Sequence, residues 1–391
     1  RRLPGYMATA VSSLAQAPDG SRTELLKTLS ENPDLQSRRL EAELLARWGD
    51  PVGGYRILAA ALPDDTIQAL SVLRSLLDQV RTLRTVEGRR AMGQVLEAMA
   101  GRSPSAQSSR LRLEAAQAYS AAGDRSSARR MLAGLADDRT APSAVSSGAA
   151  TTLVEVLIEE GKPEEAQKRL AELRATLPAD QYDQLRRGVA QAWIKDGDLS
   201  SAAASIAADT SVDGLALSGR IKLYQGDISG AFKRFRQAGP YAGDRADATR
   251  RTALLALLQS IQEDSLPELG KALLQLERGD TADAAAGLEQ VAAALPPDHG
   301  GAELNLLAGR VLMAGGRQTD AERVLRAAVT KEAPATAPAA ELALADLLIG
   351  SRRSDEAVAL LEHLILTYPQ SALVPQARRK LDEARGAVPK T

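Results

Sequence analysis

The sequence contains no cysteine, which excludes disulfides, thiolate zinc sites and cysteine nucleophiles. Aromatic residues make up only 3% of the 391 residues, and this scarcity, together with abundant alanine, favours closely packed helices over β-sheets. No apolar run reaches the roughly 18 residues that a membrane-spanning helix needs. The net charge of −1 provides no overall field to attract nucleic acid or an anionic membrane.

Residues that could carry catalysis or bind metal are also scarce. The two histidines, His299 and His363, are 64 residues apart and have no partner at the spacing of a metal site. The sequence has no phosphate-binding glycine loop that ends in Lys-Ser or Lys-Thr, and no Gly-x-Ser-x-Gly motif. We therefore predict a protein that is not an enzyme and that uses no metal and no cofactor.

What the sequence does contain is a repeated junction between two amphipathic helices. Apolar residues recur three and four positions apart on both sides of a glycine, and an alanine follows that glycine by five positions. A degenerate copy replaces the glycine with Arg352 before Ala357, and a weaker copy lies at Gly49. Five of the six steps between the regular copies and the degenerate copy span 29 to 38 residues and one spans 53, which is typical of helix-turn-helix repeats. The regular copies are Gly123/Ala128, Gly161/Ala166, Gly197/Ala202, Gly226/Ala231, Gly279/Ala284 and Gly316/Ala321.

Each residue of the junction has a physical role in this prediction. The glycine ends the first helix because it tolerates the left-handed conformation that follows the last turn. The short acidic residues that follow some glycines, Asp198, Asp227 and Asp280, can cap the second helix. The alanine is small because the two helices approach each other closely there.

These junctions resemble the tetratricopeptide repeat family over roughly residues 35–370. Tyr119 and Trp193 match the family's aromatic position, and Gly219 and Gly309 match its small position. Other copies depart from the aromatic position, at Leu157, Gln275 and Leu312. The resemblance implies an all-α fold, an α-solenoid of stacked antiparallel helix pairs forming a right-handed superhelix. A generic helical bundle is the alternative, and six junctions of identical internal spacing argue against it.

Changes in the repeat pattern divide the chain into six predicted segments. The additional helix that breaks the period is interpreted either as a hinge, which bends or splits the array, or as part of a lengthened repeat. The segments are an N-terminal cap or degenerate repeat (1–34), degenerate helical repeats (35–104), tetratricopeptide-like repeats (105–239), the additional helix (240–263), further tetratricopeptide-like repeats (264–370), and a capping helix with a tail (371–391).

A row of polar residues marks a candidate binding surface. If the resemblance holds, the residues six positions before each junction line the concave face of the first helices, and six of these seven are polar. A buried position would rarely be polar, because unpaired buried polar groups are costly. The same pattern also fits an ordinary solvated helix face. The six polar residues are Gln117, Glu155, Gln191, Arg220, Arg310 and Asp346.

The resemblance implies a protein-protein interaction scaffold that docks partner proteins. We expect it to bind no nucleic acid. The stretch Leu364–Leu381 is similar to stretches of bacterial periplasmic and outer-membrane-associated tetratricopeptide proteins, so we expect a periplasmic or otherwise extracytoplasmic role in an envelope, secretion or surface assembly. The alternatives are a helical arm of a larger exopolysaccharide-export or enzyme machine, and a sensor arm of a cytoplasmic regulator. Because the sequence begins at Arg1 and not at Met, we also expect it to be a segment of a longer chain.

Overall fold

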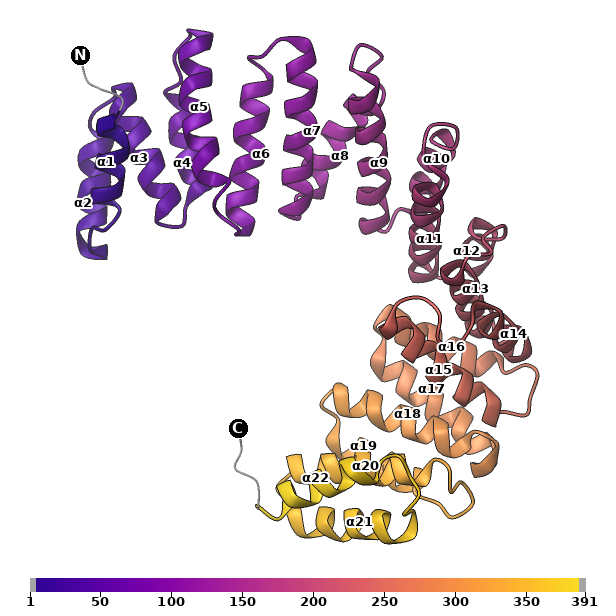
Figure 1. The fold of residues 1–391 in the computed structure, drawn as a ribbon. Helices are drawn as coiled ribbons and strands as arrows, with labels where there is room; N and C mark the ends of the chain where they lie inside the picture. Colours follow the sequence, from indigo (N-terminus) through magenta and orange to yellow (C-terminus); the bar gives the residue numbers. More distant parts are fainter. Residues whose placement is uncertain (1–4, 387–391) are drawn as a thin grey trace. The chain divides into compact units, whose positions relative to one another are not determined.

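The all-α fold class is confirmed. The computed structural model describes residues 5–386, which form 22 α-helices, one 3-10 turn and no β-strand (Figure 1). The chain divides into two compact units, residues 1–189 and 190–391, and the division falls within α11 (Ala179–Asp196). Each unit is described separately below.

In the first unit, helices that follow one another in the sequence pack side by side (Figure 1). Its core between α3 and α7 is built from buried aliphatic side chains, among them Leu73, Leu76 and Leu96. The helices before α11 are α1 (Gly5–Leu14), α2 (Asp19–Ser30), α3 (Leu35–Arg47), α4 (Pro51–Ala60), α5 (Thr66–Val80), α6 (Val86–Ala100), α7 (Ser105–Ala121), α8 (Arg125–Ala136), α9 (Ser143–Glu159) and α10 (Pro163–Glu172).

The second unit continues the pairwise packing around one larger core, whose biggest fully buried side chain is Phe235. A 3-10 turn, Pro297–His299, precedes one of its first helices. The helices after α11 are α12 (Leu199–Ser205), α13 (Val212–Tyr224), α14 (Ile228–Ala238), α15 (Arg245–Ser260), α16 (Pro267–Arg278), α17 (Thr281–Ala294), α18 (Gly301–Ala314), α19 (Gln318–Ala328), α20 (Ala337–Gly350), α21 (Ser354–Thr367) and α22 (Val374–Ala384).

The junctions have the predicted backbone conformation. All six junction glycines have positive φ, between 69° and 101°, and the weaker copy at Gly49 has φ of 98°. Arg352 has φ of 61° and is the one non-glycine residue with positive φ among residues 5–386. The seven alanines that follow these junctions, from Ala128 to Ala357, are all 0% exposed. Two of the three predicted helix caps are present, since Asp198 and Asp227 accept backbone N–H bonds. The Asp280 side chain makes no capping hydrogen bond.

The small position explains how closely the two helices of a pair approach. A Cβ added to Gly219 of α13 would lie 2.7 Å from the Phe235 ring of α14, and one added to Gly309 of α18 would lie 2.6 Å from Leu325 of α19. These contacts are shorter than a carbon–carbon contact allows, so both positions require glycine.

The helix that breaks the period is α15, and it lies inside the second unit. Despite this extra helix, α16 packs directly against α13, as the first helix of the next repeat would. The chain after α15 runs antiparallel to the junction of the preceding repeat, where Leu266 N–H donates to Gly226 O at 2.8 Å and Ile228 N–H donates to Asp264 O at 3.0 Å. The stacking of α13 on α16 therefore continues past α15.

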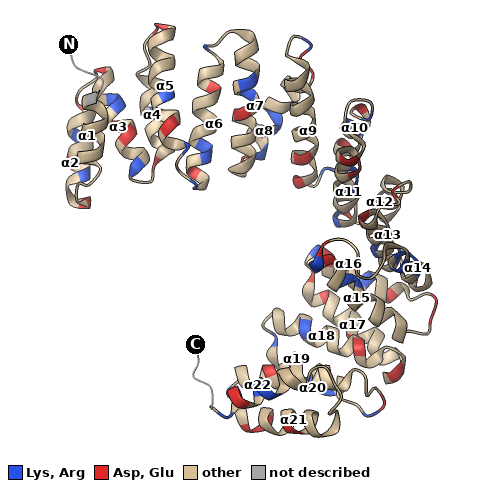
Figure 2. Ribbon diagram, in the orientation of Figure 1, with Lys and Arg blue, Asp and Glu red and all other residues tan. Residues whose placement is uncertain are grey.

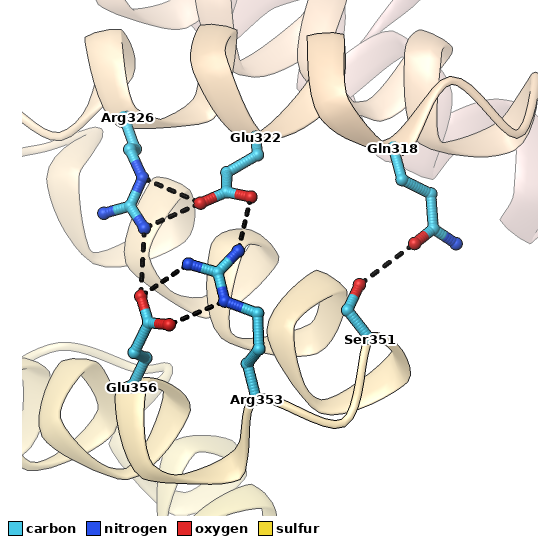
Figure 3. Close-up of polar contacts among 6 residues, drawn as sticks. All are labelled: Gln318, Glu322, Arg326, Ser351, Arg353 and Glu356. Atoms are coloured by element: carbon cyan, nitrogen blue, oxygen red, sulfur yellow. Dashed lines mark hydrogen bonds and ion pairs between the residues drawn. The ribbon is translucent and has the colours of Figure 1, made fainter.

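A ring of charged side chains joins two second helices of this unit (Figure 3). Arg326 and Glu322 of α19 pair at 2.7 Å, and Arg353 pairs with Glu322 at 2.7 Å and with Glu356 of α21 at 2.6 Å. A contact of 3.3 Å between Arg326 and Glu356 closes the ring. The ring leaves none of these four charges without a partner.

Candidate partner-binding surface

Four of the six predicted contact residues are exposed on first helices. Gln117 of α7 and Glu155 of α9 belong to the first unit, whereas Gln191 of α11 and Arg310 of α18 belong to the second. Arg310 makes no ion pair within the described range 5–386, so its guanidinium is available to a partner. The row is thus two shorter groups of residues, one in each unit.

The other two predicted residues are half-buried and are bound within the protein. Arg220 Nη2 of α13 lies 2.6 Å from Glu277 Oε1 of α16, and Tyr224 OH donates to the second oxygen of Glu277 at 3.0 Å. Asp346 of α20 lies 3.0 Å from Lys380 Nζ of α22. Both residues therefore join neighbouring helices, and replacing either one would disturb packing as well as any partner.

The structure adds a hollow that the sequence did not reveal. It has a volume of about 710 Å³ and lies on the first helices α1, α3 and α5 of the first unit. Met7, Ala8 and Val11 of α1 form an apolar wall on one side of this hollow. Trp48 fixes this end of α1 by donating from Nε1 to Ala15 O at 3.0 Å.

The opposite side of the hollow is polar and is centred on a buried carboxylate. Glu43 of α3 is 3% exposed, yet it accepts bonds from Arg39 Nε at 3.0 Å, Ser75 Oγ at 3.0 Å and Gln79 Nε2 at 2.8 Å. Arg39 also donates from Nη2 to Ser75 Oγ at 2.7 Å. These bonds satisfy the buried charge and fix the three side chains in position.

Two charged groups at this hollow are accessible to a ligand. Asp78 of α5 is exposed and forms no ion pair within residues 5–386. The Gln79 Oε1 atom accepts no hydrogen bond, but it is buried and a ligand cannot reach it. Arg47, at the end of α3, is exposed and forms no ion pair in the part of the chain that the structure describes. The hollow therefore offers one carboxylate, Asp78, and one cation, Arg47, beside an apolar wall.

A signal for this site was present in the sequence. Glu43 lies six residues before Gly49, which is the same offset that selected the other six residues. The copy at Gly49 is weak because Gly54 stands where the regular copies have alanine, so its pattern does not single out Glu43. The partners Ser75 and Gln79 lie 32 and 36 residues away from Glu43 and carry no local pattern.

The charges of the surface are mixed in sign. Partial burial and the nearby negative charge of Glu159 raise the pKa of Glu155 above its ordinary value. Lys and Arg alternate with Asp and Glu along both units, with no large field of one sign (Figure 2).

Among residues 5–386, no three His, Asp or Glu side chains are grouped as metal ligands would be. Within the same range, no helix combines the length and the apolar character that spanning a membrane requires.

Comparison with known proteins yields structural neighbours but no sequence relatives. No family model matches the sequence, and no curated protein matches it. A crystal structure of a tetratricopeptide repeat protein from Parabacteroides merdae ATCC 43184 is similar over 71% of this chain and 99% of that one, with 14% identity and a TM-score of 0.33. The tetratricopeptide domain of P58(IPK) is similar over 98% of this chain and 97% of that one, with 14% identity and a TM-score of 0.25. Because both TM-scores are low, the description of the fold depends on this chain's own junctions and helix packing.

Proposed function

We propose that this protein is a non-catalytic scaffold that docks partner proteins on the surface of its first helices. The observation that carries this proposal is the hollow on α1, α3 and α5, where a buried hydrogen-bonded network fixes the polar side and Arg47 and Asp78 are exposed and unpaired beside an apolar wall. Rigid side chains with a few unmatched polar groups are the usual composition of a recognition site. The exposed residues Gln117, Glu155, Gln191 and Arg310 extend the same kind of surface along each unit.

We further propose that the partners belong to a bacterial envelope, secretion or surface assembly. The similarity of Leu364–Leu381 to periplasmic and outer-membrane-associated repeat proteins supports this location. The lack of cysteine is compatible with an oxidising compartment. A helical arm of a larger export machine would use the same surface in the same way.

Affinity capture with matched variants tests the docking proposal. Ala8 is exposed and lines the hollow, so Ala8→Trp fills it without removing any hydrogen bond. Arg310→Glu reverses the unpaired charge in the second unit. The control is Ala253→Trp, the same change at an exposed position of α15. All variants are first checked for unchanged helical content and melting temperature, because a misfolded variant would lose partners trivially.

The expected result is a partner that the native chain and the control retain and that Ala8→Trp or Arg310→Glu loses. Capture is carried out separately from the envelope and cytoplasmic fractions of the source organism. A partner that both surface variants retain would contradict docking on the first helices. Capture from the cytoplasmic fraction alone would instead contradict the proposed location and leave the docking surface standing.

A further inference from the structure

A second surface of the first unit has three cations that form no ion pair within residues 5–386. Two hollows, of about 540 and 420 Å³, lie between its second helices and share Arg130 of α8 in their linings. The larger one lies between α8 and α10, above Leu153 and Leu157 of α9. The smaller one lies between α6 and α8 and includes Arg112 of α7. We call the two hollows together the second-helix furrow.

The cations of the second-helix furrow fall into two classes. Arg129 and Arg169 are paired, with Glu160 at 3.5 Å and Asp137 at 3.0 Å. Arg112, Arg130 and Lys168 are exposed and form no ion pair within residues 5–386.

The acidic residues of the furrow do not balance these three cations. Glu172 pairs with Arg169 at 3.2 Å, and Glu97 accepts from Tyr119 OH at 2.8 Å. Glu97 and Glu165 have no cation within ion-pair distance in the described part of the chain, since the Tyr119 hydroxyl is neutral. Three unpaired positive charges therefore face two unpaired negative charges.

The second unit shows which carboxylate the second-helix furrow lacks. Arg323 of α19 pairs at 2.7 Å with Glu289 of α17, the preceding second helix. Arg323 lies seven residues after the junction glycine of its repeat, and Glu289 lies ten residues after that of its own repeat. Lys168 occupies the same position as Arg323, but the position that corresponds to Glu289 is Ala133. Ala133 lines the larger hollow, so the place that a carboxylate takes in the second unit is open here.

A glycine widens the smaller hollow. Gly134 lies in the last turn of α8, one turn after Arg130, and a Cβ added to it would meet nothing within 4 Å. Glycine within a helix lowers helix stability, and here no neighbouring helix requires a small residue. Its absence of a side chain leaves space beside Arg130.

We propose that the second-helix furrow is a second docking surface, which takes an acidic segment of a partner protein. Carboxylates of that segment would occupy the place that Glu289 takes in the second unit. The segment should carry several acidic residues, because the unpaired cations Arg112, Arg130 and Lys168 lie on three different helices. No aromatic side chain lines either hollow, and base stacking on aromatic rings is what single-stranded nucleic acid would need.

Fluorescence anisotropy on the full chain tests this assignment. The probe is a labelled peptide with Glu at every third position and Ser between, and the control peptide has Lys in place of Glu. The variant Ala133→Glu supplies the missing carboxylate from within, where it can reach Lys168, so the fold is not expected to suffer. The matched variant Ala133→Gln adds a side chain of similar size without the charge.

The native chain and Ala133→Gln should bind the Glu peptide at low salt, with affinity that falls as salt rises. Ala133→Glu should weaken binding by about tenfold or more, because it neutralises one cation and repels the peptide. Equal binding of both peptides, equal affinity of both variants, or tighter binding of a labelled oligothymidylate would each overturn the proposal. Arg310→Glu should leave this binding unchanged, which separates it from docking on the first helices.

Discussion

At the scale of single residues, Arg352 is the position where the chain departs from its own rule. Every other junction of the pattern has a glycine in the left-handed conformation, whereas Arg352 adopts it with a side chain, at φ of 61°. That conformation costs a non-glycine residue about 1 kcal/mol or more. We therefore expect Arg352→Gly to raise the free energy of unfolding by about 1 kcal/mol, measured by urea denaturation.

The control substitution should change the free energy of unfolding in the opposite direction. Arg378 is exposed in the middle of α22, where glycine loses helix propensity, so Arg378→Gly should lower the free energy of unfolding by about 1 kcal/mol. If both substitutions were destabilising, the strain assigned to Arg352 would be wrong.

Glu341 predicts how stability depends on pH. Its side chain is 1% exposed, His363 Nδ1 lies 2.9 Å from one oxygen, and the other oxygen has no hydrogen-bond partner. Burial raises the pKa of Glu341, although the bond from His363 opposes this. A carboxyl whose folded pKa exceeds its unfolded pKa stabilises the fold below the unfolded value, and this stability is lost as pH rises through the folded pKa.

Glu341→Gln should therefore stabilise the protein at pH 8 by about 1 kcal/mol, because it removes a buried charge with an unsatisfied oxygen. The same substitution should have a smaller effect near pH 4, where Glu341 is largely protonated. Thermal melting of both proteins between these pH values measures the difference. A constant difference across this range would show that Glu341 is not the group responsible.

At the scale of helices, the contact between α13 and α14 is set by one missing side chain. Because a Cβ on Gly219 would overlap the ring of the fully buried Phe235, Gly219→Ala should lower the free energy of unfolding by about 1 to 3 kcal/mol, despite the better helix propensity of alanine. Gly134→Ala, where the added Cβ meets nothing, should stabilise by about 0.5 to 1 kcal/mol. Chemical denaturation of the two variants compares the same substitution with and without the close neighbour.

The helices themselves were predictable because their signals are local. The junction glycine, the alanine five residues later and the apolar spacing are all read within one helix pair, and they placed the junctions correctly. Some helix ends are harder to predict from the sequence. The hydrophobic pattern of α5 continues to Val86, but the helix ends at Val80. Thr85 then caps the next helix, α6. A short polar cap outweighs one more apolar residue, which periodicity alone does not show.

The candidate surface was less predictable because its state depends on distant neighbours. Arg220 and Arg310 have the same position in their repeats, yet one is bound to Glu277, 57 residues away, and the other is exposed. Sequence spacing identifies which face a residue occupies but not whether the next first helix carries a carboxylate. For the same reason, the pairing of Glu43 with Gln79 and the lack of a partner for Lys168 appear only in the structure.

At the scale of the whole chain, helices pack mainly with their sequence neighbours, so stability should be local. In such arrays each repeat contributes its own term and an interface term with its neighbours. Amide hydrogen exchange of the Gly219→Ala variant should accelerate in α13, α14 and α16 while α3 to α7 keep their native protection. Uniform acceleration along the chain would show that the array unfolds as one cooperative block.

The return of the chain after α15 makes the segment before α16 a place where an insertion should be tolerated. Hydrogen bonds between residues 264–266 and 226–228 fix the chain just before α16, and α13 and α16 stack directly although a whole helix separates their repeats. The length of chain between Ala238 and Pro267 is therefore not dictated by the stack. A foreign loop, epitope or small domain could be inserted there without shifting the register of the flanking repeats, whereas deleting α15 would expose the core that its buried Leu257 and Leu258 contact.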